Sequence, residues 1–184
     1  KKKKKEPFPI QYIGVLSRME KKELPKTIDI LLLLSGPEPQ RTLFEEKLKT
    51  IFKGSEKKIL LVRGLVEKTQ EWGSFENIEM VNFMKSKELE ETINKSEIVV
   101  CRSGYTTIMD LAILEKKAFL VPTPGQYEQE YLAKRLKSLG IVPSCKQEKF
   151  KLKKLNKVTV YKGLKTLSQQ PVNYSELFSL FEGK

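Results

Sequence analysis

The sequence predicts an α/β protein with a Rossmann-like, doubly wound parallel sheet, and three observations support this prediction. Short apolar runs rich in Ile, Leu and Val alternate with segments whose apolar residues recur at helical spacing. The run 28–34 is almost continuously apolar, as expected for a strand buried on both faces. Turn-forming Gly and Pro residues separate many of these segments, and such alternation gives right-handed βαβ units.

Each expected strand is a short run of β-branched and other apolar residues. Several of these runs end at turn-forming residues. The run 28–34 is followed by Ser35 and Gly36, and the run 118–121 is followed by Pro122. In chain order, we expect strands at 12–17, 28–34, 59–62, 78–83, 98–101, 118–121 and 141–142.

Each expected helix has apolar residues three and four positions apart, so that one face covers the sheet. Gly54 follows the first helix and Gly140 follows the fourth, and glycine is typical of the position after a helix end. The pattern weakens beyond residue 146. In chain order, we expect helices at 41–53, 86–94, 106–115, 127–139, 158–167 and 174–181.

Composition indicates one folded domain. We expect residues 1–27 to form a basic tail and interdomain linker, and residues 28–184 to form the domain. The absence of histidine excludes Ser-His-Asp and Cys-His nucleophilic sites and argues against a zinc site. The two cysteines make no disulfide framework, and no secretory signal is seen, which favours a reduced, cytoplasmic location. Without GxxxxGK[ST] or GxGxxG, an ordinary P-loop or dinucleotide enzyme is not expected.

The net charge of +12 is concentrated in two segments, residues 1–22 and residues 146–165. These segments are either solvated surfaces or a peripheral contact with an anionic membrane, such as the inner membrane. Few aromatic residues lie among the lysines, so nucleic acid is not an expected partner.

Residues 97–133 are the most informative segment, because they read as strand, Ser-Gly turn, helix, strand, Pro-rich loop and helix. Ligands of open α/β sheets bind beyond the carboxyl ends of strands, and helix N-termini favour phosphate. The sequence therefore predicts a phosphate site near Ser103 and Gly104. Arginines at the same edge suit a diphosphate or a carboxylate. The other candidate residues are Arg18, Arg63, Arg102, Thr106, Thr107, Asp110, Gln126, Gln129 and Glu130.

The order of these residues resembles the C-terminal domain of family-28 glycosyltransferases. The resemblance covers roughly residues 10–142 and is most specific over 97–133, where CRSG precedes a threonine, an acidic residue and a Gln-Glu pair. It implies the C-terminal half of a GT-B fold, which binds a UDP-sugar donor without a cofactor or a metal. It also implies a separate N-terminal domain, absent from this chain, that holds the acceptor and the general base.

The resemblance also implies roles for individual residues. Ser103 and Gly104 correspond to the diphosphate-binding turn, and Thr107 corresponds to the threonine beside the phosphates. Asp110 stands where the family usually has a ribose-binding Glu. Gln129 and Glu130 correspond to the pair that reads the sugar hydroxyls, with Glu130 replacing a common Gln.

Two segments nearer the N-terminus complete the resemblance. Arg18, in YIGVLSR, corresponds to a linker arginine that approaches the diphosphate. Ser35 and Gly36 occupy the first Gly-rich loop, although SGPEPQR differs from the usual GGSQG and suggests a divergent branch.

We therefore expect the donor-binding domain of a hexosyltransferase that uses UDP-GlcNAc or a related donor in making a cell-envelope polysaccharide. The isolated chain is expected to bind nucleotide but to turn over poorly. One alternative is a nucleotide-sugar epimerase or hydrolase on the same scaffold. The other is a non-catalytic subunit that binds a membrane partner through its basic segments.

Overall fold

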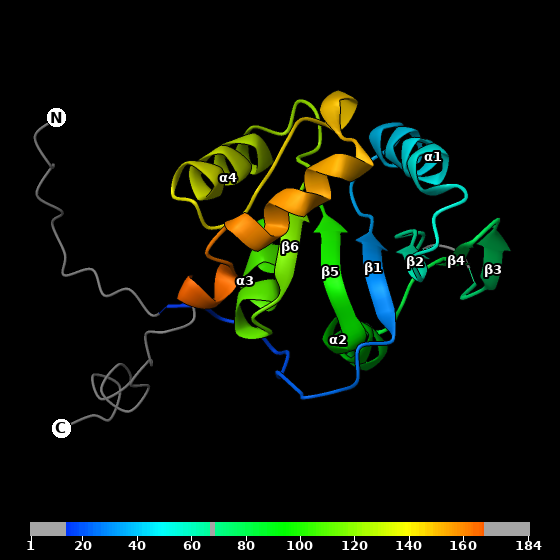
Figure 1. The fold of residues 1–184 in the computed structure, drawn as a ribbon, viewed down its shortest axis with the longest axis horizontal. Helices are drawn as coiled ribbons and strands as arrows, with labels where there is room; N and C mark the ends of the chain where they lie inside the picture. The colour runs from blue at the N-terminus through cyan, green and yellow to red at the C-terminus, as the bar shows by residue number, and fades with distance from the viewer. Residues whose placement is uncertain (1–13, 67–68, 168–184) are drawn as a thin grey trace, which may run out of the picture.

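The computed structural model describes residues 14–66 and 69–167, which form one six-stranded sheet covered by helices on both faces (Figure 1). The strands are β1 Ile28–Leu33, β2 Ile59–Val62, β3 Trp72–Phe75, β4 Ile78–Val81, β5 Ser96–Cys101 and β6 Lys117–Leu120. The α-helices are α1 Gln40–Phe52, α2 Ser86–Lys95, α3 Tyr105–Ile113 and α4 Tyr127–Ser138. Three 3₁₀ helices follow: η1 Gln147–Lys149, η2 Leu152–Val160 and η3 Leu164–Leu167.

The strand order is β3-β4-β2-β1-β5-β6, and all neighbouring pairs are parallel except β3 and β4. After β1 the chain builds β2, β4 and β3 on one side, and it then crosses to add β5 and β6 on the other. The strand order thus reverses between β1 and β5. Because ligands of such sheets bind beyond the carboxyl ends of the strands at this reversal, the topology marks one place as the candidate site.

Alternate residues along the central strands enter two separate cores, which is why these strands read as continuous apolar runs. Leu31 packs with α2, α3 and α4 in one core. Leu32 packs with α1 and η2 in the other, and Figure 1 shows η2 crossing in front of β5 and β6. Phe150 anchors this second core by contacting three aromatic rings, those of Phe44, Phe52 and Phe119. The doubly wound α/β fold expected from the sequence is confirmed.

The edge strand β3 was not expected, because its sequence Trp-Gly-Ser-Phe has no apolar run. All four residues are exposed, and the strand exists only through antiparallel pairing with β4. A two-residue turn joins the two strands, and its Glu76 has a φ of 53°. The β4 strand also ends at Val81, two residues earlier than expected.

The strand expected at 12–17 is wrong over its described part. Residues 14–17 are not in a strand, and Gly14 has a φ of 77°. The chain from 17 to 26 instead lies along α2 and α3, where side chains supply its hydrogen-bond partners. The buried Met19 enters the core there.

The expected strand at 141–142 is also wrong. The amides of Ile141 and Val142 donate to the carbonyl of Leu136, so these residues form a turn after α4. An isolated bridge pairs Leu120 with Ser144 instead. The helix expected at 158–167 is two 3₁₀ helices, η2 and η3. The two buried residues of η2, Leu155 and Val158, are three positions apart, which suits the three residues per turn of a 3₁₀ helix. The helix expected at 174–181 lies outside the described residues.

Within the described residues, no helix is long and apolar enough to cross a membrane.

Candidate functional site

A cavity of about 510 Å³ lies beyond the carboxyl ends of β1, β2 and β5, at the point where the strand order reverses. Its lining combines polar groups from the turns after β1 and β5 with apolar groups from the loops after β2 and β4. Four of the residues expected from the sequence line it: Ser35, Gly36, Arg102 and Thr107. The cavity also includes Leu33, Leu34, Val62, Gly64, Val66, Phe83, Met84, Leu89 and Cys101.

Two glycines shape the walls of this cavity. Gly36 has a φ of 105°, a conformation that L-residues rarely adopt, and it turns the chain sharply after β1. Gly64 has a φ of 74°, and a Cβ built on it would lie 2.6 Å from the carbonyl oxygen of Leu34. The loops after β1 and β2 therefore approach each other as closely as they do only because residue 64 has no side chain.

The N-terminus of α3 faces the same cavity through Thr107. Its N-cap is Gly104, no side chain caps the helix, and no acidic residue lies in its first turn. The first amides of an α-helix lack partners within the helix, and the helix dipole adds partial positive charge there. This end of α3 therefore suits an anion on chemical grounds, and the phosphate site expected at Ser103 and Gly104 stays a prediction.

Ser103 and Gln129 join the start of α3 to the start of α4. The buried Ser103 hydroxyl donates to the carbonyl oxygen of Gln129 at 2.8 Å. The side-chain oxygen of Gln129 accepts from the amide of Thr123 at 2.9 Å, and its side-chain nitrogen donates to Gln126. The carboxylate of Glu130 accepts from the amide of Gly125 at 3.2 Å. Gln129 and Glu130 of α4 thus hold the loop 122–126 in place beside α3.

Arg102 is 1% exposed and lines the cavity, and among the residues that the structure describes no carboxylate pairs with it. Its guanidinium donates to the carbonyls of Val121, Pro122 and Gln40 and lies 4.4 Å from the ring centre of Phe44. Its Nε has no hydrogen-bond partner within the described residues. Burial lowers the pKa of Arg102 to about 10, so the group stays charged at neutral pH.

Arg63 lies at the same edge but forms an ion pair with a buried carboxylate. Glu45 of α1 is 2% exposed and accepts from Arg63 Nε at 2.9 Å, Arg41 Nη1 at 2.9 Å and Lys49 Nζ at 3.0 Å. Burial raises the pKa of Glu45, but Lys49, Arg63 and Arg41 outweigh burial and leave it lowered. Arg63 also donates to Asn82 at 3.1 Å, so this cluster ties together the loops after β1, β2 and β4.

The remaining expected residues do not line this cavity. Thr106 is exposed in the first turn of α3. Asp110 lies one turn beyond Thr107 and accepts a hydrogen bond from Ser17 at 2.6 Å. Arg18 is exposed and lines a different hollow of about 520 Å³, between the linker and α2.

The sequence reasoning missed the apolar wall made by Val66, Phe83, Met84 and Leu89. Phe83 was expected to be the last residue of the strand 78–83. Placing the end of β4 two residues earlier would have put Phe83 and Met84 in the loop beyond a carboxyl end, where the same rule that found Ser103 applies.

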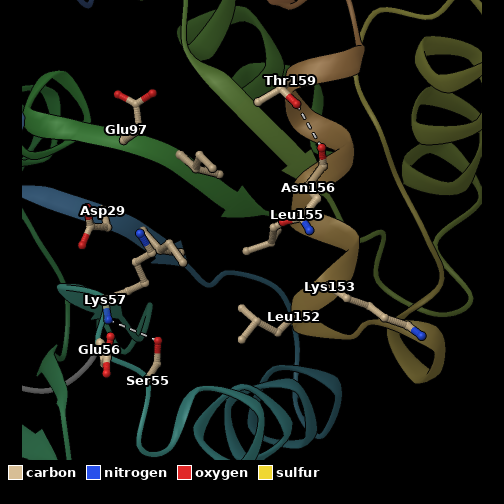
Figure 2. A pocket seen from close by; sticks show the side chains of 12 residues that line it. Asp29, Ser55, Glu56, Lys57, Glu97, Leu152, Lys153, Leu155, Asn156 and Thr159 are labelled. Atoms are coloured by element: carbon tan, nitrogen blue, oxygen red, sulfur yellow. Dashed lines mark hydrogen bonds between the residues drawn. The ribbon is translucent and has the colours of Figure 1, made fainter.

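A larger cavity of about 750 Å³ lies at the opposite end of the strands, between η2 and the amino-terminal halves of β1 and β5 (Figure 2). Two of its polar side chains have partners close by in the sequence: Ser55 accepts from the amide of Lys57, and Thr159 donates to the carbonyl of Asn156. Size alone does not make a site, and the amino ends of the strands lack the free helix amides found beyond β5. We therefore take the smaller cavity as the candidate site.

The fold and this site define a Rossmann-like domain of the kind that forms the C-terminal half of GT-B glycosyltransferases. Residues 32–176 match the family model of the glycosyltransferase family 28 C-terminal domain. The chain therefore belongs to this family, and the resemblance seen over 97–133 is confirmed.

Individual relatives agree with this assignment. The chain is 36% identical over 66 residues to a UDP-N-acetylglucosamine--N-acetylmuramyl-(pentapeptide) pyrophosphoryl-undecaprenol N-acetylglucosamine transferase of Methylobacterium radiotolerans, covering 35% of this chain and 18% of that protein. The structure of this chain is similar to that of MurG of Acinetobacter baumannii, with a TM-score of 0.58 and 18% identity. The match covers 95% of this chain and 57% of MurG. For the glycosyltransferase SnogD of Streptomyces nogalater the TM-score is 0.57 at 12% identity, with coverage of 85% and 43%.

The chain thus spans less than two thirds of the length of each of these relatives.

Proposed function

We propose that this chain is the donor-binding domain of a glycosyltransferase and that its cavity binds a UDP-sugar, with UDP-GlcNAc or a close relative as the donor. One observation carries the proposal: the cavity at the strand-order reversal is bounded by the uncapped N-terminus of α3 on one side and by an apolar wall on the other. A nucleoside diphosphate has the matching pair of properties, a charged diphosphate and a flat base.

Different parts of the ligand would bind at different ends of the cavity. The diphosphate would lie at Ser103, Gly104 and Thr107, where helix amides favour an anion and Arg102 adds positive charge from below. The base would lie against Phe83 and Met84, which shield its faces from water. The sugar would extend toward the start of α4, where Gln126, Gln129 and Glu130 offer hydrogen-bonding groups.

The contribution of this domain to catalysis would be to stabilise the leaving UDP. When the bond between sugar and diphosphate breaks, negative charge grows on the diphosphate, and amides already directed at that position stabilise it without reorganisation. The acceptor and the general base would come from a second domain. We therefore expect the isolated chain to bind UDP while transferring sugar poorly.

Calorimetric titration of the full 184-residue chain with UDP tests the proposal. We expect saturable binding that weakens about tenfold in Thr107→Val, since one hydrogen bond to a charged group is worth about 1.5 kcal/mol. Thr159→Val, on the exposed surface of η2, is the control and should bind like the wild type. Absence of UDP binding in the wild type, or equal binding by Thr107→Val, would count against the site.

An epimerase or hydrolase on the same scaffold would share the UDP site. Product analysis with a UDP-sugar and the complete enzyme separates these alternatives: transfer requires an acceptor, whereas hydrolysis and epimerisation proceed without one.

A peripheral contact with an anionic membrane is favoured by one surface observation. Among the exposed lysines of residues 146–165, Leu152 is 40% and Val160 is 81% exposed. Lysines beside exposed aliphatic side chains suit the headgroup region of an anionic bilayer. This placement would go with a cytoplasmic enzyme. The other basic segment, residues 1–22, lies mostly outside the described residues.

Sedimentation with phosphatidylcholine vesicles, with and without phosphatidylglycerol, tests the membrane contact. The wild type should bind only the anionic vesicles and should be released by salt. Lys153→Glu with Lys157→Glu should abolish binding, whereas Lys134→Glu with Lys137→Glu on α4 should have less effect. Equal binding by both double variants would contradict a contact through residues 146–165.

A further inference from the structure

A hydrogen bond between residues 93 positions apart connects the linker to the candidate site. The hydroxyl of Ser17 donates to Oδ1 of Asp110 at 2.6 Å. Asp110 lies one turn after Thr107 on α3, and residues three apart lie on the same side of a helix. Within the described residues, the second carboxylate oxygen of Asp110 accepts no hydrogen bond and is available to a ligand.

The direction of this hydrogen bond is fixed by a second one. The Ser17 oxygen accepts from the amide of Met19 at 3.0 Å, so its single proton is free to point at the carboxylate. Met19 is 6% exposed and packs in the core shared by α2 and α3. The Ser17 hydroxyl is therefore held by a buried neighbour.

The next residues fasten the same segment to α2. The amide of Glu20 donates to Glu90 at 3.1 Å, and its carbonyl accepts from Asn94 at 3.0 Å. Lys22 pairs with Glu90 at 2.5 Å. Because Leu89 of the same helix lines the cavity, the segment 17–22 connects the helix beside the apolar wall with the carboxylate beside the phosphate turn.

We propose that Ser17 is a positioning residue that orients the Asp110 carboxylate toward the ribose diol of the bound nucleotide. This inference rests on the proposed function, and it assigns to the linker a part in reading the sugar of the nucleotide. An Asp is one methylene shorter than a Glu and reaches less far, so the direction of its carboxylate matters more. Ser17 holds Oδ1 and leaves Oδ2 to accept from a ribose hydroxyl.

Ligands that differ only in the ribose provide the test. UDP and 2′,3′-dideoxy-UDP are titrated into the full chain as wild type, Ser17→Ala, Ser17→Thr and the control Ser138→Ala. Ser138 is an exposed residue whose hydroxyl bonds only within α4. We expect Ser17→Ala to weaken UDP binding about fivefold, the size of a typical net hydrogen bond, with no change for dideoxy-UDP. Ser17→Thr keeps the hydroxyl and should bind UDP like the wild type.

Each outcome decides the inference. A purely structural role for Ser17 would weaken both ligands alike, and tighter UDP binding by Ser17→Ala would mean that Ser17 competes with the ribose. Either result, or unchanged UDP binding, overturns the inference while the UDP site stands. Absence of UDP binding by the wild type overturns the proposed function as well.

Discussion

The buried cluster around Glu45 provides the sharpest test of how the site is held together. Glu45→Ala removes a carboxylate that is 2% exposed and that accepts from Arg41, Lys49 and Arg63. Breaking a buried ion pair by removing one partner costs about 3–5 kcal/mol. Arg41 keeps Glu38 as a partner, and Arg63 keeps Asn82. We therefore expect the free energy of unfolding to fall by about 3 kcal/mol, near the lower end of that range.

Urea unfolding followed by circular dichroism measures this loss as a shift of the midpoint at constant m-value. Glu46→Ala is the matched control, because Glu46 is next in the helix, pairs with Lys49 at 3.0 Å and has a side chain that is 64% exposed. An exposed pair contributes about 0–1 kcal/mol. If the two variants lost the same free energy of unfolding, burial would not be the reason that the Glu45 ion pairs stabilise the fold.

The same cluster predicts a pH effect of definite sign. Because the folded state lowers the pKa of Glu45 below its ordinary value of 4.5, its contribution is fully present above that value. The contribution is lost as the pH falls through the folded-state pKa. The unfolding free energy of Glu45→Gln should therefore fall less steeply than that of the wild type when the protein is acidified below about pH 4.5.

Three further predictions concern single positions. Gly64→Ala should lower the free energy of unfolding by more than about 2 kcal/mol, because the new Cβ would lie 2.6 Å from the Leu34 carbonyl oxygen and the φ is unfavourable. Gly54→Ala, with a φ of 72° and nothing within 4 Å of the new Cβ, should lower it only by the conformational penalty of about 1–2 kcal/mol. Equal losses measured by urea unfolding would contradict this prediction. Lys116 is 6% exposed, and burial, together with the nearby Lys26, lowers its pKa to about 7. Between about pH 7 and the ordinary lysine pKa of 10.5 the unfolded chain therefore binds more protons, and the free energy of unfolding should rise with pH by up to about 1.4 kcal/mol per unit, a slope that Lys116→Met should remove. Ser103→Ala removes the bond to Gln129 and should lower stability by about 1 kcal/mol and weaken UDP binding, with Ser138→Ala as the control for both measurements.

The sequence predicted those parts of the fold and site that depend on local patterns. The central strands and the four α-helices follow from apolar periodicity, and all four helices begin and end within two residues of the expected positions. Ser35, Gly36, Arg102 and Thr107 reach one cavity because each follows a parallel strand and all such ends meet at one edge.

Features that depend on distant pairing could not be read in this way. The strand β3 exists because β4 offers it a free edge, not because of its own residues. Arg63 looked like a free cation at the edge of the sheet, and only folding brings Glu45, 18 positions away, to neutralise it. The bond from Ser17 to Asp110 spans 93 positions and leaves no trace in local composition.

The charges at this edge, taken together, show which group remains for an anion. Glu38 and Glu45 together supply two negative charges that balance Arg41 and Arg63, so neither arginine offers a free positive charge to the cavity. Arg102 differs: its partners are carbonyls, and within the described residues no carboxylate lies within 4.0 Å of it. Burying a cation without a counter-charge is costly, and its lowered pKa records that cost. A diphosphate at the α3 N-terminus would supply a counter-charge to Arg102, so this buried arginine would stabilise the complex that we propose.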